Sequence, residues 1–439
     1  MAGKLLKHAR VLALRVLHHL FHIWAWEHAI YHSIDLFPNI IKHPLCIIRN
    51  KIKRNISLES KYFEITGRCP LPWEATFLLD NRCNARCLMC MVADYFNDNL
   101  AKKISLDKFK TIAKNIHLEK LRAVILSGAG EPFLNEDILD IISFVNQHYP
   151  QVMVRITTNA IALTPKKAEE LVKMNVDSLT ISVNAGTKET YKKVMQVDCF
   201  ERVVENIKYY QELCLKAKKR PSIYPCFVAH RKNIGDLIKF VELGNTLGIK
   251  LLITGYCRFY PKSQRLRLAA SEENFLDDSD SLFFHQDLSD RYFKEAQKLS
   301  HHLGIEFIRE PLFSEDFPRE KCKFPFNAIL VGMDGEVFPC CGGGEVIFKE
   351  KVSRGDYNFG NLLEHRIEDF WNNDYYRAIR YSALNPWNPA VPECSVCAQA
   401  LMWNGHIQKG HVLEWDGLSD KSIDFGLIQP KKLRSGGSM

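Results

Sequence analysis

The sequence lacks several features that would assign it to a common class. No run of about 20 uncharged apolar residues is present, as a membrane-spanning helix would need. A phosphate-binding glycine loop, an HExxH helix and a Ser-His-Asp order are also missing. There is no low-complexity segment, and no signal peptide with a short apolar run and a small-residue cleavage site opens the chain. These absences argue against a spanning membrane protein, a P-loop nucleotidase and the common hydrolases.

Cysteine, in contrast, is abundant, with 14 among 439 residues. The chain is 46% apolar and 25% charged, and at this length it can bury a core without disulfide bonds. Clustered cysteines without an export signal are typical of metal ligands in a reducing compartment, so we expect a cytoplasmic protein. We interpret Cys46, Cys69, Cys199 and Cys214 as structural. Eight others fall into two groups, which are Cys83, Cys87 and Cys90, then Cys322, Cys340, Cys341, Cys394 and Cys397.

The positive charge is concentrated in residues 1–60, where nine Lys or Arg face three acidic residues, so +6 of the net +8 lies there. Within this arm Arg15, His18, His19 and His22 share one helical face, and leucines with aromatic residues occupy the other. One interpretation is an interfacial helix on an anionic membrane surface at the inner face of the membrane. The alternative is an amphipathic helix docked on the protein's own core or on a partner subunit. Nothing in the charge pattern favours a nucleic acid partner.

From about residue 74 the pattern changes to strands alternating with helices, which predicts a parallel sheet covered by helices. Six such units would form a partial (β/α)6 TIM-like barrel of the α/β class, with its chemistry at the carboxyl ends of the strands. We expect this core over 74–260, a connecting helical and strand segment over 261–317, a cysteine-rich module over 318–400 and a tail over 401–439. The expected strands are 75–79, 123–126, 152–157, 178–183, 223–228 and 251–254. The expected helices are 106–116, 136–147, 165–174, 202–218, 235–247 and 290–303.

Three thiols, Cys83, Cys87 and Cys90, follow the first expected strand with the spacing C-x3-C-x2-C. A structural zinc site needs four ligands, and this loop supplies three with no adjacent histidine. Three cysteines on a cubane of four irons leave one iron open for chemistry. Further polar elements follow the next strands, namely Gly128-Ala129-Gly130-Glu131-Pro132, then Thr158-Asn159, then Ser182 and Asn184.

This order resembles the radical S-adenosylmethionine (SAM) superfamily, and the resemblance covers roughly residues 74–400. It implies that the three thiols bind a [4Fe–4S] cluster whose open iron takes the amino and carboxylate groups of SAM. Ala129 stands where the family has its first glycine, and Met89 stands where it prefers an aromatic residue beside the last cysteine. The resemblance implies SAM contacts at Met89, Gly128, Ala129, Gly130, Glu131, Asn159, Ser182 and Asn184.

The second cysteine group includes a hairpin signal, in which Asp334-Gly335 is flanked by apolar residues. It resembles the SPASM/twitch extension of radical SAM enzymes, which holds auxiliary [4Fe–4S] clusters. With five of the seven cysteines of a full SPASM domain, one auxiliary cluster is expected. Its expected ligands are Cys322, Cys340, Cys394 and Cys397, with Cys341 as a rival for Cys340; a zinc site closed by four of these thiolates is the alternative.

We therefore expect a radical SAM enzyme that forms a 5′-deoxyadenosyl radical and abstracts a substrate hydrogen, with a reductant such as flavodoxin or ferredoxin. Cys257, after the sixth strand, is a candidate hydrogen-atom donor, although a free cysteine is more often a small buried apolar residue. The basic arm does not resemble the leader-binding domain of peptide modifiers, which favours a small-molecule substrate such as a sugar, or a lipid-linked precursor. The alternatives are a radical SAM peptide or protein maturase and a non-catalytic zinc or iron–sulfur protein.

Overall fold

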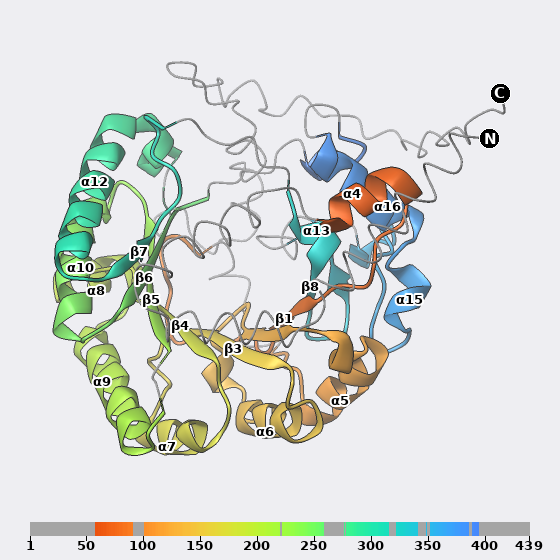
Figure 1. Cartoon of the computed structure of the whole chain (residues 1–439), viewed down its shortest axis with the longest axis horizontal. Helices are drawn as coiled ribbons and strands as arrows, with labels where there is room; N and C mark the ends of the chain where they lie inside the picture. Colours follow the sequence, from red (N-terminus) through yellow and green to blue (C-terminus); the bar gives the residue numbers. More distant parts are fainter. Residues whose placement is uncertain are drawn as a thin grey trace, which may run out of the picture.

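A single curved sheet organises the chain in the computed structural model (Figure 1). The structure describes residues 58–90, 101–219, 222–258, 276, 278–315, 322–340, 348, 352–385 and 389–394. The predicted arm up to residue 57, the predicted ligands Cys341 and Cys397, and the tail lie outside these residues. Among the described residues, no helix is both long and apolar enough to cross a membrane.

The sheet has nine strands in the order β7-β6-β5-β4-β3-β2-β1-β8-β9, and its two edges do not pair with each other. Every neighbouring pair is parallel except β8 with β9. The predicted partial barrel is therefore confirmed as an open α/β arrangement. The strands are β1 (Glu74–Leu78), β2 (Ala123–Ser127), β3 (Met153–Thr158), β4 (Ser178–Ser182), β5 (Ile223–Ala229), β6 (Leu251–Tyr256), β7 (Glu306–Ile308), β8 (Ala328–Val331) and β9 (Val337–Phe338).

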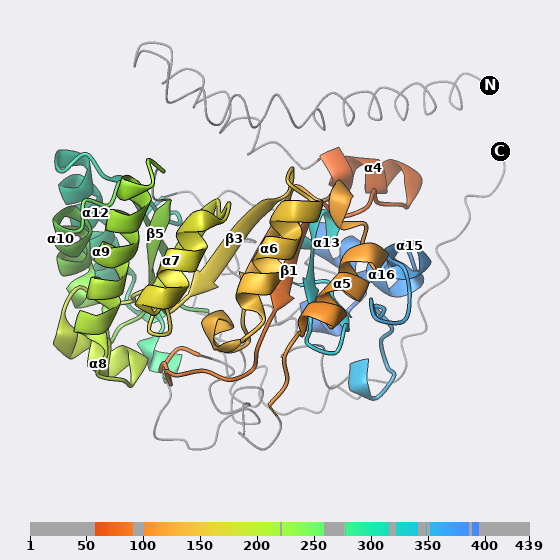
Figure 2. The same ribbon diagram turned by 90° about the horizontal axis from the view of Figure 1, so that it is seen from below.

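Helices cover the convex face of this sheet and leave the concave face toward the interior (Figures 1 and 2). Side chains of a strand alternate between the two faces, and Phe227 of β5 packs against Phe240 of α10 with ring centroids 5.2 Å apart. The alternate residues Cys226 and Val228 therefore face the interior. The covering helices are α5 (Leu106–Asn115), α6 (Ile138–His148), α7 (Pro165–Lys173), α8 (Lys188–Met195), α9 (Phe200–Lys216), α10 (Leu237–Thr246) and α12 (Gln286–His302).

The helix starts follow local capping chemistry. Ser105, Thr164 and Thr187 each accept a bond from a first-turn amide, which satisfies one free helix donor. The helix predicted from residue 136 begins instead at Ile138. The side chain of Asn135 accepts from the Asp137 amide at 2.9 Å and forms an Asx turn before the helix.

The segment 261–317 contributes a further unit to the sheet. The amphipathic helix α12 packs on α10, and the chain then turns at Gly304, whose φ of 67° is left-handed. β7 follows and pairs in parallel with β6. The connecting segment thus contains a seventh β-strand of the barrel wall.

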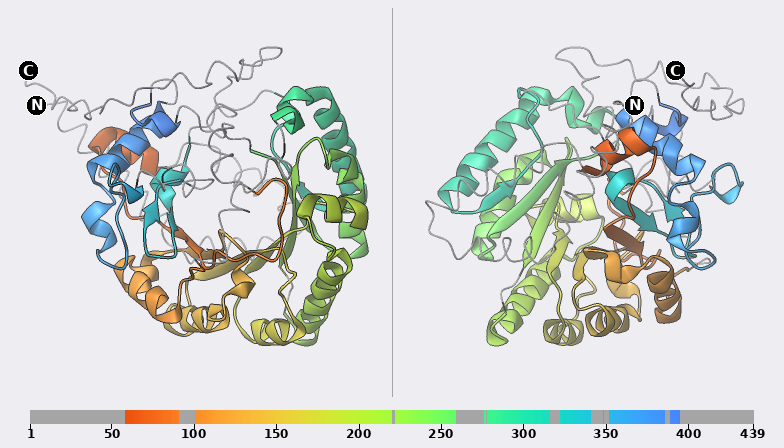
Figure 3. Two further views of the ribbon diagram at one scale, coloured as in Figure 1. Left: turned by 180° about the vertical axis from the view of Figure 1, so that it is seen from behind. Right: turned by 45° about the vertical axis from the view of Figure 1, so that its right-hand side comes forward.

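The cysteine-rich module joins the same sheet on the other side of β1 (Figure 3). The predicted hairpin is confirmed, since β8 and β9 pair in antiparallel fashion and Gly335 has a φ of 82° in their turn. The indole of Trp371 is fully buried and donates to the Pro70 carbonyl at 2.6 Å, which fixes the module to the chain before β1. Its helices are α13 (Phe324–Asn327), α15 (Ile367–Phe370) and α16 (Asp374–Leu384), next to α4 (Leu58–Thr66).

Candidate functional site

The segment 80–90, here called the cysteine loop, follows β1 at the carboxyl edge of the sheet and lies against the end of α8. The amides of Arg86 and Leu88 donate to the carbonyls of Met195 and Val194 at 3.2 and 2.9 Å. The Cys90 amide donates to the Cys87 carbonyl at 2.9 Å, which closes a turn between two of the thiols. Cys83, Cys87 and Cys90 are all half-buried on this loop.

The chemistry of these thiols fits an iron–sulfur cluster. Burial raises the pKa of Cys83, and burial together with the neighbouring Cys90 and Cys83 raises the pKa of Cys87 well above its usual range. Cysteine binds metal as a thiolate, so these sulfurs need a positive centre to ionise. Among the described residues, no group of three or more His, Cys, Asp or Glu side chains is spaced for a single metal ion.

A glycine turn after β2 presses against the cysteine loop. The amides of Gly130 and Glu131 donate to the carbonyls of Asp80 and Arg82 at 2.8 and 2.7 Å. A Cβ on Gly130 would lie far inside 3.0 Å of the Arg82 carbonyl, and one on Gly128 would collide with Gly130. Both glycines are therefore required for the close approach of the two segments.

The carboxylate of Glu131 is buried and bonded to protein groups. It accepts from the Thr158 hydroxyl at 2.6 Å, the Asn159 amide at 2.8 Å and the Phe133 amide at 3.1 Å. Burial raises the pKa of Glu131, while these three bonds favour its ionised form. The carboxylate connects the end of β2 to the end of β3.

Asn159 continues this connection to the cysteine loop. Its side-chain amide donates to the Asn84 side chain at 2.8 Å and to the Cys83 sulfur at 3.8 Å. Its side-chain oxygen accepts from the Ile161 amide at 2.9 Å, which fixes the orientation of the amide group. The residue is buried, with 7% exposed.

The two candidates after β4 differ in their surroundings. Asn184 is buried with a left-handed φ of 59°, and its side chain bonds to the Val228 amide at 2.8 Å and the Met195 sulfur at 3.4 Å. These bonds make Asn184 a link between the ends of β4, β5 and α8. Ser182 is half-buried at the end of β4, opposite Cys226, and its hydroxyl has no bond within the described part of the chain.

Met89, within the cysteine loop, packs against a small cluster that contains Cys257. Buried Leu88, Cys257 and Leu276 form a small apolar cluster, against which Met89 and Val228 pack. The Cys257 amide donates to the Ala229 carbonyl at 2.8 Å, so the residue sits where β5 and β6 end. The structure thus places Cys257 next to the loop, in apolar surroundings.

In the second module, Cys322, Cys340 and Cys394 are half-buried and lie before α13, after β9 and at the end of the short turn Pro392–Cys394. The structure describes three of the four predicted auxiliary ligands. Cys341 lies outside the described residues, so the structure does not distinguish it from Cys340 as a ligand.

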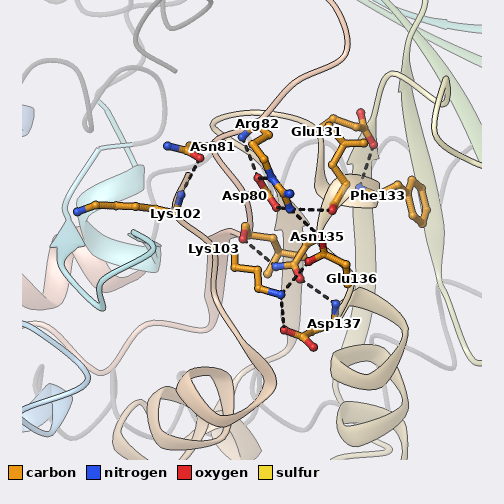
Figure 4. A network of polar contacts seen from close by, with 12 residues as sticks. Asp80, Asn81, Arg82, Lys102, Lys103, Glu131, Phe133, Asn135, Glu136 and Asp137 are labelled. Carbon is orange, nitrogen blue, oxygen red and sulfur yellow. Dashed lines mark hydrogen bonds and ion pairs between the residues drawn. The ribbon is translucent and has the colours of Figure 1, made fainter. Parts of the chain in front are cut away.

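A network of ion pairs and hydrogen bonds just before Cys83 had not been expected from the sequence (Figure 4). Asp80 is fully buried and accepts from the Arg82 amide, Nε and Nη2 at 2.8, 3.0 and 2.7 Å. Arg82 also reaches Glu136 at 3.2 Å, while Asn135 donates to the carbonyls of Leu79 and Ile104. The sequence signal for this network was Asp80, a polar residue directly after the expected strand 75–79.

His230, directly after β5, is a second unexpected residue. It is fully buried, and burial lowers its pKa to about 4. Its Nδ1 accepts from the Lys232 amide at 3.2 Å, which leaves the proton on Nε2. Within the described ranges this Nε2 has no hydrogen-bond partner.

Comparison with known proteins agrees with this arrangement. The family model described as the radical SAM superfamily matches residues 79–243, and the one described as an iron–sulfur cluster-binding domain, SPASM, matches residues 322–398. The chain is 24% identical over 328 residues to the tungsten-containing aldehyde ferredoxin oxidoreductase cofactor-modifying protein of Pyrococcus furiosus. That alignment covers 72% of this chain and 86% of the relative. A probable GTP 3′,8-cyclase of Saccharolobus islandicus is 32% identical over 39% of this chain and 52% of its own length, so the chain spans about half of that relative.

Solved structures show the same fold. Streptococcus suis SuiB bound to S-adenosylmethionine has a TM-score of 0.56 at 15% identity, over 86% of this chain and 81% of that one. Native anSMEcpe with bound AdoMet has a TM-score of 0.52 at 14% identity, over 70% of this chain and 82% of that one.

Proposed function

Because the chain belongs to the radical SAM superfamily and carries a SPASM iron–sulfur domain, we propose that Cys83, Cys87 and Cys90 hold its SAM-binding [4Fe–4S] cluster. When bound, this cluster and SAM supply a 5′-deoxyadenosyl radical that takes a hydrogen atom from the substrate. The observation that carries the proposal is the bonded contact between the cysteine loop, the Gly128–Pro132 turn and Asn159 at adjoining strand ends.

The chain's own residues would divide the work of that site. Gly128 and Gly130 allow the backbone to approach the cysteine loop, and Glu131 holds the turn to β3. Ser182 offers a hydroxyl at the end of β4, and the soft thioether of Met89 would pack on the adenine ring of SAM. We assign Cys322, Cys340, Cys394 and Cys397 to one auxiliary cluster, which would accept an electron or anchor the substrate.

The test is anaerobic release of 5′-deoxyadenosine from SAM by the iron-loaded protein with a flavodoxin or ferredoxin as electron donor. We expect release from the wild type and none from the triple Cys83, Cys87 and Cys90→Ala variant. The matched control is Cys214→Ala, which removes a buried thiol of α9 on the outer face of the barrel. Equal release from the triple variant and the wild type would refute the assignment.

For the substrate we propose a non-peptide molecule, such as a sugar or a lipid-linked precursor. The sequence relatives support this choice, because one is named for modifying a cofactor and others as cyclases of GTP. The second candidate is a peptide or protein substrate. It is favoured by structural neighbours crystallised with peptides, SuiB with its precursor peptide SuiA and anSMEcpe with the peptide Cp18Cys.

Deuterium transfer separates these two substrate classes. Extracts of cells grown in deuterated medium are divided into a small-molecule fraction, a lipid fraction and a polypeptide fraction. Each fraction is freed of its own SAM and 5′-deoxyadenosine and incubated with enzyme, reduced flavodoxin or ferredoxin, and unlabelled SAM. Deuterium in 5′-deoxyadenosine from the first two fractions supports a non-peptide substrate. Deuterium only from the polypeptide fraction, lost after protease treatment, supports a maturase.

We also propose that residues 1–60 place the enzyme at an anionic membrane surface in the cytoplasm. The nine basic residues of this segment support the proposal. In a flotation assay with vesicles of phosphatidylserine and phosphatidylcholine, the full chain should rise with the vesicles and residues 61–439 should not. Equal flotation of the two chains would exclude a membrane role for the arm.

A further inference from the structure

The side-chain amide of Asn159 contacts a sulfur of the cysteine loop, which gives this residue a role other than holding SAM. The Asn159 Nδ2 lies 3.8 Å from the Cys83 Sγ, within the range of an N–H···S contact. Hydrogen bonds to cluster sulfurs are one of the means by which a protein sets the reduction potential of an iron–sulfur centre. Resting on the proposed function, we propose that Asn159 is a positioning residue that raises the reduction potential of the SAM-binding cluster.

The amide cannot turn freely away from the sulfur, because each of its polar atoms is engaged. The Oδ1 accepts from the Ile161 amide at 2.9 Å, and the Nδ2 donates a second bond to Asn84 at 2.8 Å. Since Oδ1 is an acceptor in this bond, the assignment of oxygen and nitrogen is fixed by the network. One Nδ2 hydrogen therefore goes to Asn84 and the other faces Cys83.

The backbone of Asn159 is fixed as well. Its amide donates to Glu131 at 2.8 Å, and Glu131 is held by Thr158 at 2.6 Å. Glu131 in turn belongs to the turn that bonds to the Arg82 carbonyl, one residue before Cys83. The donor and the sulfur are thus held by the same network of hydrogen bonds.

The electrostatic consequence has a definite sign. Reduction adds one electron from a flavodoxin- or ferredoxin-class donor to the cluster without a proton, so the negative charge on the cysteine sulfurs increases. An N–H donor stabilises this more negative form, and its removal makes the cluster harder to reduce. We expect about a tenfold change in the reduction equilibrium, which is about 59 mV for a one-electron couple.

Two variants isolate the donor. Asn159→Asp keeps an oxygen for the Ile161 amide and lacks the N–H group, but it adds a negative charge. Asn159→Leu has a similar size and adds no charge, so its shift reports the loss of the donor without that charge. The matched control is Asn206→Ala, which removes an amide that donates to the Ala160 carbonyl at 2.8 Å, one residue from Asn159 and away from the sulfur. All proteins are loaded with iron and sulfide anaerobically and titrated with dithionite, with the reduced clusters followed by electron paramagnetic resonance.

The signal that changes when SAM is added afterwards identifies the SAM-binding cluster, and the auxiliary cluster serves as an internal reference. We expect both Asn159 variants to shift the midpoint of the first signal to a more negative potential, with the reference signal and Asn206→Ala unchanged. An unshifted midpoint in loaded Asn159 variants would overturn the proposal while the proposed function stands. The proposal also fails if the control shifts equally, or if both Asn159 variants fold by circular dichroism but lose the cluster. A wild type without a SAM-responsive signal would reject the proposed function itself.

Discussion

Acid should destabilise this protein through His230, whose imidazole is buried and neutral. Burial lowers its pKa to about 4, against an ordinary value of 6.5. The groups that face it from neighbouring segments are Asp280, which opposes this shift, and Lys232 and Lys193, which add to it. Between these two pKa values the unfolded chain binds a proton that the folded chain does not. Above about pH 6.5, His230 therefore causes little pH dependence in the free energy of unfolding. As the pH is lowered from 6.5 toward 4, that free energy falls.

The size of the loss follows from the same two values. One pKa unit corresponds to about 1.36 kcal/mol, so the full shift would remove about 3 kcal/mol once the pH is well below 4. Between pH 7.5 and 5.5 the expected loss in the free energy of unfolding is about 1.3 kcal/mol, roughly a tenfold change in the unfolding equilibrium.

The assay is urea unfolding at these two pH values under anaerobic conditions, followed by tryptophan fluorescence. His230→Asn keeps an oxygen near Nδ1 that can accept from the Lys232 amide, and it has no proton to gain. Its stability should therefore fall less than that of the wild type by about 1.3 kcal/mol over this interval. The control His301→Asn changes an exposed residue of α12 and should behave as the wild type. The reasoning is refuted if His230→Asn loses as much stability on acidification as the wild type.

Three further substitutions address other parts of the chain. Gly130→Ala forces its Cβ against the Arg82 carbonyl. We therefore expect less iron bound at the cysteine loop and a loss of about 1–3 kcal/mol in the free energy of unfolding. In the control Gly235→Ala the new Cβ meets no atom closer than 3.7 Å, so neither change is expected. Trp371→Ala should lower the free energy of unfolding by about 3–5 kcal/mol in urea titrations, because a fully buried indole and its hydrogen bond to the Pro70 carbonyl are lost. A change below about 1 kcal/mol would contradict its role in docking the cysteine-rich module. If Cys257 returns a hydrogen atom to the substrate radical, Cys257→Ser should lower the ratio of product to 5′-deoxyadenosine in mass spectrometry, and an unchanged ratio would remove it from the chemistry.

The sequence predicted the wall of the barrel well because the periodicity of buried residues sets strands and helices locally. The six expected core strands occur at the expected places, with ends that differ by at most two residues. The joining of β8 to β1 could not be predicted, since β8 is a short apolar run and its pairing partner lies about 250 residues away in the chain. The bounds of α6 were displaced by the Asn135 turn, whose bond depends on a side-chain conformation.

Within the site, the sequence predicted which segments meet but not how their polar atoms are used. The order of the motifs placed the cysteine loop and the Gly128–Pro132 turn at one edge. Hydrogen-bond partners depend on tertiary geometry, so the engagement of Glu131 by Thr158 had no sequence signal. His230 had none either, because a single histidine after a strand forms no spacing pattern.

The use of polar atoms restricts which predicted residues can contact SAM. The side-chain oxygens of Glu131 accept three protein bonds, and the side chain of Asn184 bonds to Val228 and Met195. A carboxylate has about four acceptor sites and a side-chain amide has two N–H donors, so these bonds leave Glu131 about one acceptor site and Asn184 one N–H for a ligand. We therefore expect Glu131 and Asn184 chiefly to shape the site, with at most one or two bonds each to the cofactor. The hydroxyl of Ser182 and the backbone of Gly128 and Ala129 are the better candidates for direct contact, because binding there breaks no bond made by the described residues.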